Sequence, residues 1–317
     1  MATKLLRRTA ITLGLALALA SGFAWWKSER NDRAAEAAFP PVGEFLTVGE
    51  TRVHYWRAGA GPTIVLLHGA GGNLRDFTLS LGPQLAKTHT VIAFDRPGHG
   101  FTDTLHDRGE SPAEQAALFH AALGQLGIED AIIGGFSYGG SVAMAWALNH
   151  PETAAGVLMM NGVSNPWVTP PSRLYDLAAG TLTGPVFATA LSAFAPQALV
   201  DDTLSGLFAP NPPPAGYLAH IGPGLSLRRE TLRANGRQVV TLLPHVERQS
   251  ARYPTLTLPI ELVHGADDVS VPSSIHADVL ASQVPQARLT RVPGVGHSVH
   301  HHAQDAVLAA VARLTQP

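Results

Sequence analysis

The sequence contains no cysteine among its 317 residues, and only 15% of them are charged. The absence of thiols excludes disulfides, cysteine metal ligands and a cysteine nucleophile. It leaves the compartment open, because a chain without thiols is unharmed in an oxidising space. The net charge of −2 gives no reason to expect nucleic acid or another strongly charged partner. With 45% hydrophobic residues, a chain of this length can bury a large core.

One uncharged run stands out near the N-terminus, where 18 residues from Thr9 to Trp26 follow several basic residues. Its length suits a marginal transmembrane helix and exceeds the core of an ordinary signal peptide. Ala18-Leu19-Ala20 fits a signal-peptidase site, whereas Trp25 and Trp26 before Lys27 fit the far end of a retained anchor. The segment is therefore expected to be a signal peptide or a signal anchor.

The sequence divides into an N-terminal segment, a linker and one folded domain. Residues 1–27 form the signal peptide or signal anchor, which keeps its basic end inside. The remainder is exported: it faces the periplasm or the extracellular side, or is secreted if the segment is cleaved. Residues 28–43 are polar, Ala-rich and end near two prolines, which predicts a linker. The domain follows over 44–317, and its proline-rich part without strand patterns, about 162–254, predicts an inserted helical cap.

Apolar runs alternate with helical segments through the domain. This alternation predicts an α/β fold: a mostly parallel central sheet with helices on both faces. Ser111, Pro112 and Glu114 are the start signals of one such helix, and 74–87 also fits a helix. In an open sheet of this kind, the chemistry lies in loops at the carboxyl ends of the strands. The expected parallel strands are 63–67, 90–94, 131–133, 156–160, 260–263 and 287–292.

The sequence Gly135-Phe136-Ser137-Tyr138-Gly139 joins one of these strands to a good helix-forming segment. A serine on a sharp strand-to-helix turn has a strained backbone, and side chains at either flanking glycine would collide with the turn or the adjacent strand. The hydroxyl group then lies over the N-terminus of the helix, where developing negative charge is stabilised. A Gly-rich turn with an incidental serine is the alternative, so Ser137 needs partners elsewhere in the chain.

Those partners come from a resemblance, because four motifs in this order are similar to those of the α/β-hydrolases. The resemblance covers roughly residue 44 to the C-terminus. It implies the α/β-hydrolase fold and catalysis by a serine, a histidine and an acid, without a cofactor. The four motifs are His68-Gly69-Ala70-Gly71-Gly72, the turn around Ser137, Gly265-Ala266-Asp267-Asp268-Val269-Ser270-Val271-Pro272, and Gly294-Val295-Gly296-His297.

Each motif has a chemical role in this interpretation. A serine hydroxyl is a weak nucleophile, so His297 takes the proton of Ser137 while Asp268 fixes the tautomer of the imidazole and stabilises its positive form. Two backbone N–H groups stabilise the oxyanion. Tyr138, the residue after the nucleophile, supplies one of them, and by resemblance Ala70 supplies the other.

Nearby residues offer alternatives. Asp267 could replace Asp268, although the Gly-x-x-Asp spacing before Val-Pro favours Asp268. His99 could act as the base, although His297 has the context of the motif. The run His300 to His302 could suggest a metal site, but consecutive helical positions point in different directions and no cysteine assists, so no metal is expected.

The cap is expected to set specificity. Arg229, Arg233 and Arg237 recur at helical spacing and either bind a substrate carboxylate or form a solvated helix face. We expect an exported serine hydrolase of small, apolar carboxylic esters, held at a membrane by an uncleaved N-terminal segment. Alternatives are a carbon–carbon bond hydrolase, favoured if these arginines face Ser137, a cofactor-free perhydrolase or haloperoxidase-like enzyme, and a non-catalytic binding protein on the same scaffold. The oligomeric state stays open.

Overall fold

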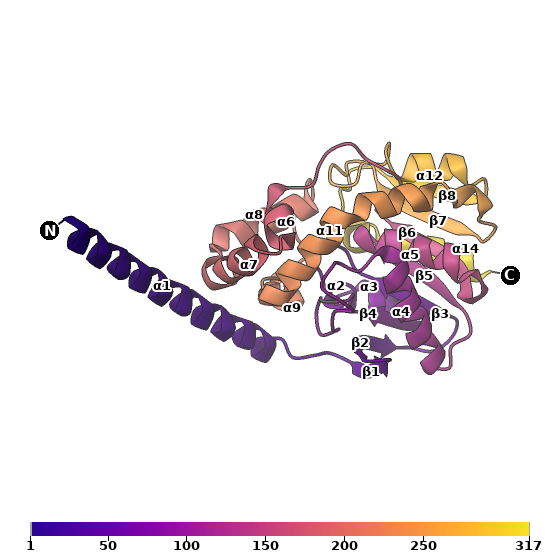
Figure 1. Ribbon diagram of the computed structural model, residues 1–317. Helices are drawn as coiled ribbons and strands as arrows, with labels where there is room; N and C mark the ends of the chain where they lie inside the picture. The colour runs from indigo at the N-terminus through magenta and orange to yellow at the C-terminus, as the bar shows by residue number, and fades with distance from the viewer. Residues whose placement is uncertain (1, 317) are drawn as a thin grey trace.

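An eight-stranded sheet forms the centre of the molecule, in a computed structural model that describes residues 2–316 (Figure 1). The strands are β1 (Glu44–Val48), β2 (Thr51–Ala58), β3 (Thr63–Leu67), β4 (Thr90–Phe94), β5 (Ala131–Phe136), β6 (Ala154–Met160), β7 (Ile260–Gly265) and β8 (Ala287–Val292). Their spatial order is β1-β2-β4-β3-β5-β6-β7-β8. β2 is antiparallel to β1 and β4, and all other neighbours are parallel. The mostly parallel α/β sheet predicted from the sequence is confirmed.

Helices cover both faces of this sheet. They are α2 (Arg75–Thr78), α3 (Leu81–Leu85), α4 (Pro112–Gln125), α5 (Tyr138–Asn149), α12 (Ala277–Gln283), α13 (Val299–His302) and α14 (Gln304–Thr315). Successive residues of β3 point to opposite faces: Val65 and Leu67 join the core beneath α4, α5 and α12, whereas Ile64 and Leu66 join the core beneath α2, α3 and α14. This two-sided burial explains why the parallel strands are apolar throughout.

The start signals of α4 act as the sequence predicts. The Ser111 side chain accepts a hydrogen bond from the Glu114 N–H, Glu114 accepts one from the Ser111 N–H at 2.8 Å, and Pro112 occupies the first turn. The helix expected over 74–87 is instead divided into α2 and α3. Pro83 has no N–H group to donate to the preceding turn, which disfavours a continuous helix through this segment.

The chain between β6 and β7 folds into helices that form the cap. These are α6 (Arg173–Ala179), α7 (Thr183–Phe194), α8 (Gln197–Phe208), α9 (Tyr217–Ile221), α10 (Pro223–Ser226) and α11 (Arg229–Ser250). Helix α11 is the longest of them and runs from the cap towards α5 (Figure 1). Near its end, Gln249 Nε2 donates a hydrogen bond to the carbonyl of Ser141 on α5 at 3.2 Å. The cap is thereby joined to the helix that follows Ser137.

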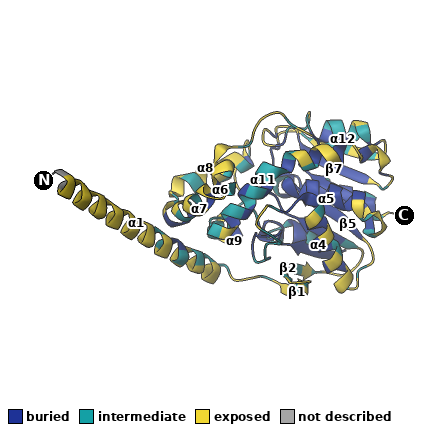
Figure 2. Cartoon of the chain, viewed as in Figure 1, coloured by how far each residue is buried: buried dark blue, intermediate teal, exposed yellow. Residues whose placement is uncertain are grey.

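Helix α1 (Ala2–Ala38) projects from the domain and is exposed along most of its length (Figures 1 and 2). From Leu6 it is long and apolar enough to cross a membrane, by length and composition. The linker predicted over 28–43 is wrong for residues 28–38, because the helix continues to Ala38 and packs on α7 and α10. Asn31 donates a hydrogen bond to the Ser192 carbonyl at 2.8 Å, and Asp32 accepts one from the Ser192 hydroxyl at 2.8 Å. Polar side chains thus contribute to a contact between α1 and the cap that the linker prediction did not include.

Candidate active site

Ser137 lies between β5 and α5 with backbone angles φ 53° and ψ −119°. A positive φ is unfavourable for a residue with a side chain and costs about 1–3 kcal/mol. The backbone is held there by three hydrogen bonds: Ser137 N donates to the Met160 carbonyl at 3.1 Å, and its carbonyl accepts from Gly140 N and Val163 N at 3.0 and 2.9 Å. The surrounding loops therefore fix the strained turn.

The flanking glycines are required for the reason the sequence suggested. A Cβ atom at Gly135 would lie 2.3 Å from the carbonyl oxygen of Gly139, within the turn. A Cβ atom at Gly139 would lie 2.1 Å from the carbonyl oxygen of Leu67 on the adjacent strand β3. Both distances are far shorter than a non-bonded contact allows, so the collision expected at each glycine is confirmed.

Three further polar residues lie on the loops next to this turn. Asn161 follows β6, Asp268 follows β7 and His297 follows β8. Since β5, β6, β7 and β8 are consecutive neighbours in the sheet, all four loops, including that of Ser137, lie at its carboxyl edge.

Asp268 and His297 form a buried hydrogen-bonded pair. The distance from His297 Nδ1 to Asp268 Oδ2 is 2.8 Å, and the two residues are 5% and 6% exposed, respectively. The other carboxylate oxygen accepts hydrogen bonds from Ser270 N and Val271 N at 2.8 and 2.9 Å. Burial favours the neutral acid, but the hydrogen bond and charge of His297 outweigh it and hold the pKa of Asp268 below its usual value. An ionised Asp268 keeps the proton on Nδ1, which leaves Nε2 of His297 able to accept one.

Asn161 is a site residue that the sequence interpretation missed. Its Nδ2 donates to Asp268 Oδ2 at 2.6 Å and lies 3.4 Å from the Gly296 carbonyl. Its φ of 46° is in the left-handed region, which asparagine adopts more readily than most residues. The available signal was its position, because it is a polar residue directly after an apolar strand and directly before the predicted cap, about 162–254.

Asp267 and His99, the alternatives for the acid and the base, lie in environments that differ from those of Asp268 and His297. Asp267 is exposed, and the structure gives its backbone N–H, not its carboxylate, a bond to the Val295 carbonyl. His99 is fully buried, with Nδ1 3.0 Å from the Pro97 carbonyl and Nε2 3.4 Å from Asn235 Oδ1. Burial, reinforced by the charge of Arg96, lowers the pKa of His99 to about 3.

Phe136, the residue before Ser137, connects the nucleophile turn to His297. The Phe136 ring packs against the His297 ring with centroids 4.9 Å apart. Over residues 2–316, no hydrogen bond joins the Ser137 hydroxyl to His297. Such bonds are often long before a substrate is present and shorten in the complex.

The loop after β3 passes directly over Ser137. A Cβ atom at Gly69 would lie 3.1 Å from Ser137 Cβ. The backbone N–H groups of Ala70 and Tyr138 have no hydrogen-bond acceptor within the described chain, 2–316. Both N–H groups are therefore available to an acceptor outside the protein chain.

A model of the alpha/beta hydrolase fold matches residues 62–303 of the chain. The chain belongs to this family. The match includes the loop after β3, Ser137, Asp268 and His297, and the sheet order described above is consistent with it.

Proteins similar to this α/β-hydrolase include enzymes of different kinds. The chain is 31% identical over 263 residues to polyketide synthase ThaQ from Burkholderia thailandensis. The matched region covers 79% of this chain but only 12% of ThaQ. It is 28% identical over 289 residues to 2-hydroxymuconate semialdehyde hydrolase from Pseudomonas sp. strain CF600, covering 85% of this chain and 93% of that enzyme. The crystal structure of a membrane phospholipase A, a bacterial virulence factor, superposes with a TM-score of 0.65 at 18% identity, covering 98% of this chain and all of that one. The last likeness shows a shared fold.

A buried arginine orients the loop over Ser137 in the hydrolase. Arg96 Nη2 donates to the Gly69 carbonyl at 3.2 Å, and His68 Nδ1 donates to the same oxygen at 2.8 Å. Because a peptide bond is planar and trans, fixing the Gly69 carbonyl turns the Ala70 N–H in the opposite direction. Burial lowers the pKa of Arg96 to about 10, so it stays a cation, and its guanidinium lies 4.1 Å from the centre of the Tyr138 ring. The sequence analysis did not single out Arg96.

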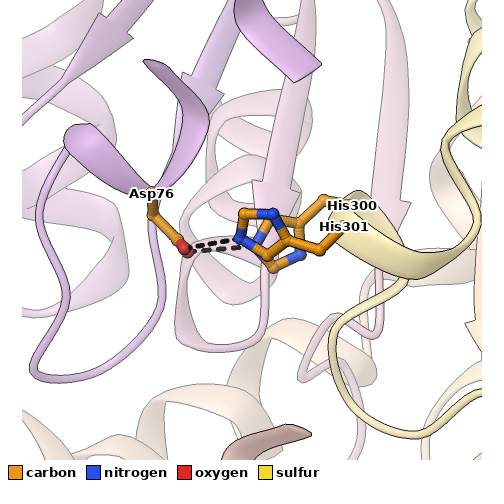
Figure 3. A group of neighbouring side chains, drawn as sticks. All are labelled: Asp76, His300 and His301. Atoms are coloured by element: carbon orange, nitrogen blue, oxygen red, sulfur yellow. Dashed lines mark hydrogen bonds and ion pairs between the residues drawn. The ribbon is translucent and has the colours of Figure 1, made fainter. Parts of the chain in front are cut away.

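Asp76, His300 and His301 form a second polar cluster (Figure 3). Each histidine Nε2 lies 3.0 Å from a carboxylate oxygen of Asp76, and the Tyr217 hydroxyl donates to Asp76 at 3.0 Å. The expectation that adjacent histidines diverge is wrong here, because α13 is only four residues long and both side chains turn to one carboxylate. The pKa of Asp76 is well below its usual value because the two histidines outweigh its burial.

These three side chains could also ligate a metal ion, since their ligand atoms lie within 4.8 Å of one another. A ligating histidine normally donates its second ring nitrogen to an acceptor. Within the described residues, Nδ1 of His300 and of His301 is buried without a hydrogen-bond partner. The cluster connects α2, α9 and α13 and lies beside the site, because the His300 ring packs on Phe136 at 4.1 Å between centroids.

The three cap arginines of the hydrolase line a cleft that does not include Ser137. Arg229 Nε lies 2.8 Å from Asp32 Oδ2, and this arginine also pairs with Glu29. Arg229, Arg233 and Arg237 all line this cleft of about 570 Å³, which α1 shares with the cap. The side of α11 that carries these three arginines therefore faces α1.

Proposed function

We propose that this α/β-hydrolase cleaves carboxylic esters through an acyl-enzyme. The observation that carries the proposal is the buried bond between ionised Asp268 and Nδ1 of His297, on loops adjacent to the strained turn of Ser137. This pair leaves His297 Nε2 as the base for the only serine at the strand-to-helix turn.

The reaction proceeds in two halves. The Ser137 hydroxyl loses its proton to His297 Nε2 as its oxygen bonds to the ester carbonyl carbon. The oxyanion is stabilised by the N–H groups of Ala70 and Tyr138, which cost no reorganisation because both are already free. The carbon–oxygen bond to the alcohol breaks, and His297 returns the proton to the leaving alcohol. Water then attacks the acyl-enzyme in the same way, and the carboxylic acid leaves.

Carbon–carbon bond cleavage is the second candidate, favoured by the 28% identity to 2-hydroxymuconate semialdehyde hydrolase. A substrate of that kind carries a carboxylate, which needs a cation near Ser137. The cap arginines face α1 instead, and Arg229 is already paired with Glu29 and Asp32. The cation beside the loop over Ser137, Arg96, is fully buried and already donates hydrogen bonds to Gln115, Gln238 and the Gly69 carbonyl. Ester cleavage is therefore the preferred proposal.

We further propose that α1 is retained as a membrane anchor with its basic end inside and the domain outside. The helix is unbroken from Ala2 to Ala38, and its uncharged part, Thr9 to Trp26, is longer than the core of an ordinary signal peptide. Its exposed apolar part is followed by Trp25 and Trp26, as at a membrane boundary. Mass spectrometry of the mature N-terminus tests this, since a chain that begins at Ser21 has no span.

The hydrolase proposal is tested with a serine-directed fluorophosphonate and a panel of esters of graded acyl length. We expect labelling and ester turnover in the native chain and neither in Ser137→Ala. Ser282→Ala is the control, because this exposed hydroxyl is bound only to its own helix. Labelling that survives in Ser137→Ala excludes Ser137 as the nucleophile. Labelling with turnover of 2-hydroxymuconate semialdehyde but of no ester favours the carbon–carbon hydrolase.

A further inference from the structure

The cleft between α1 and the cap is unusually rich in charge. Its walls come from the end of α1, from α7 and α11, and from the loop near Thr104 and Asp107. We call it the α1–cap cleft. It is separate from Ser137, Asp268 and His297, none of which lines it.

Most of the charges that join α1 to the cap are paired. Arg228 Nη1 lies 2.7 Å from Glu36, and Arg229 binds both Glu29 and Asp32. These ion pairs are only partly exposed and connect two helices that are distant in the sequence. Each acidic residue of α1 that lines the cleft is therefore already paired with an arginine of the cap.

Two arginines in the same cleft have no ion-pair partner within 4 Å among residues 2–316, although the negative charge of Asp107 acts on Arg233 from a greater distance. Arg233 and Arg237 are one turn apart on α11, and neither side chain forms an ion pair or hydrogen bond with any residue in 2–316. Nε of Arg233 is buried and unbonded. Asp107 also lines the cleft but is exposed and makes no ion pair with either arginine.

This arrangement is unfavourable unless something else occupies the cleft. Like charges four residues apart on a helix repel each other, and a buried donor without an acceptor costs about 1–3 kcal/mol. Burial and the charge of Arg237 hold the pKa of Arg233 below its usual value, and the charge of Asp107 only partly opposes them. A bound anion would remove both costs, because two guanidinium groups can each donate a pair of hydrogen bonds to a tetrahedral oxyanion.

The position of the cleft indicates where that anion comes from. Trp25 lines it, and Trp25 and Trp26 mark the end of the apolar part of α1. Tryptophans at this position of a spanning helix lie at the level of the lipid headgroups. Because Arg233 and Arg237 line the same cleft as Trp25, a retained α1 would bring both arginines close to the headgroup region.

We propose that Arg233 and Arg237 bind the phosphate group of a membrane phospholipid in the α1–cap cleft. The inference rests on the proposed retention of α1 as an anchor, but not on the proposed ester cleavage. Bound phospholipid also stabilises α11, whose Asn235 contacts the loop over Ser137. The cleft thus connects lipid contact to the side of the active site that carries the Ala70 N–H.

The test uses the full-length Ser137→Ala chain, so that no lipid is turned over, in micelles of a neutral detergent. Mass spectrometry of the same sample confirms that α1 is intact. Isothermal titration measures the binding of dioleoylphosphatidylglycerol. Dioleoylglycerol, which lacks the phosphate, and soluble glycerol phosphate, which lacks the acyl chains, are the comparison ligands. Arg233→Gln and Arg237→Gln are compared with Arg248→Gln, which removes an exposed arginine of the same helix that bonds His245 outside the cleft.

We expect one phospholipid per chain, and an affinity about tenfold lower in each of Arg233→Gln and Arg237→Gln, because a charge-assisted bond is lost. Arg248→Gln should bind like the parent chain, and dioleoylglycerol should not bind. Equal affinity in all variants overturns the proposal. So does equal affinity for dioleoylglycerol, which indicates an apolar site, or for glycerol phosphate, which indicates a site for free phosphate.

Protein stability without lipid separates binding from a structural role. If the arginines serve a ligand, removing one of two repelling charges should leave the melting temperature of Arg233→Gln equal to or above that of Arg248→Gln. A clearly lower melting temperature shows that Arg233 stabilises the fold itself and overturns the proposal.

Discussion

Asn235 on the cap helix α11 accepts a hydrogen bond from the backbone N–H of Gly71, with 2.8 Å between Oδ1 and N. Gly71 directly follows Ala70 in the loop over Ser137, so one side chain of the cap holds the loop that carries a proposed oxyanion donor. The cap therefore helps to position the loop over Ser137.

Replacing Asn235 by alanine should lower kcat by about tenfold, because Gly71 N loses its acceptor and the Ala70 N–H loses its fixed direction. KM should change less, since the donor acts mainly on the transition state. Steady-state kinetics on one ester measure both values. Thr241→Ala is the control, because this hydroxyl bonds only to carbonyls of its own helix. An unchanged kcat in Asn235→Ala would contradict the role given to this bond.

The two adjacent aspartates give a matched pair. Asp268→Asn should lower kcat by about 10⁴, because an amide cannot stabilise the positive imidazole and favours the wrong tautomer. Asp267→Asn should stay within about twofold of the native enzyme, as expected for an exposed surface substitution. The kcat of the two variants on the same ester shows which aspartate acts with His297. Equal losses in both would remove the distinction drawn from the structure.

Two glycines test the strain at the turn. Gly139→Ala should lower the free energy of unfolding by about 3 kcal/mol or more, because its Cβ would lie 2.1 Å from the Leu67 carbonyl oxygen of β3. Gly124→Ala should raise it by about 0.5–1 kcal/mol, because that exposed position in α4 has nothing within 4 Å of a new Cβ. Denaturant unfolding of the two variants measures both changes. A stable Gly139→Ala would show that the turn relaxes easily.

Buried histidines should make the fold sensitive to mild acid. Burial lowers the pKa of His276 and His300 to about 4, and Nδ1 of His276 accepts hydrogen bonds from Ser164 N and Asn165 N. The unfolded chain binds protons near pH 6.5 and the folded chain only near pH 4. The stability present above pH 6.5 is therefore lost as the pH falls towards 4, by up to about 1.4 kcal/mol per pH unit for each histidine.

Thermal unfolding followed by tryptophan fluorescence between pH 7.5 and 4.5 measures this effect. Carboxylates with a lowered pKa, such as Asp268, contribute mainly below about pH 5, so the slope between pH 7.5 and 5 reports the histidines. His276→Gln should reduce the dependence on pH, because one of the titrating groups is gone. A melting temperature that is constant over the window would rule out the expected proton uptake.

The sequence by itself determined the features that depend on neighbours along the chain. Apolar runs specify strands that are buried on both faces, and Ser111 with Glu114 specifies the start of α4. The glycines beside Ser137 specify a turn that no other residue fits. The order of the motifs placed Ser137, Asp268 and His297 at the carboxyl ends of parallel strands, because strand direction fixes where each loop lies.

Only the tertiary structure decided which distant residues meet. Asn161 and Asp268 are 107 positions apart, and Gly71 and Asn235 are 164 apart, so neither pair leaves a local pattern. The docking of α1 and the joint orientation of His300 and His301 towards Asp76 were misjudged for the same reason. In each case a polar side chain takes its direction from a partner on another element. Local periodicity records burial of apolar faces, but it does not record which hydrogen-bond partner the fold supplies.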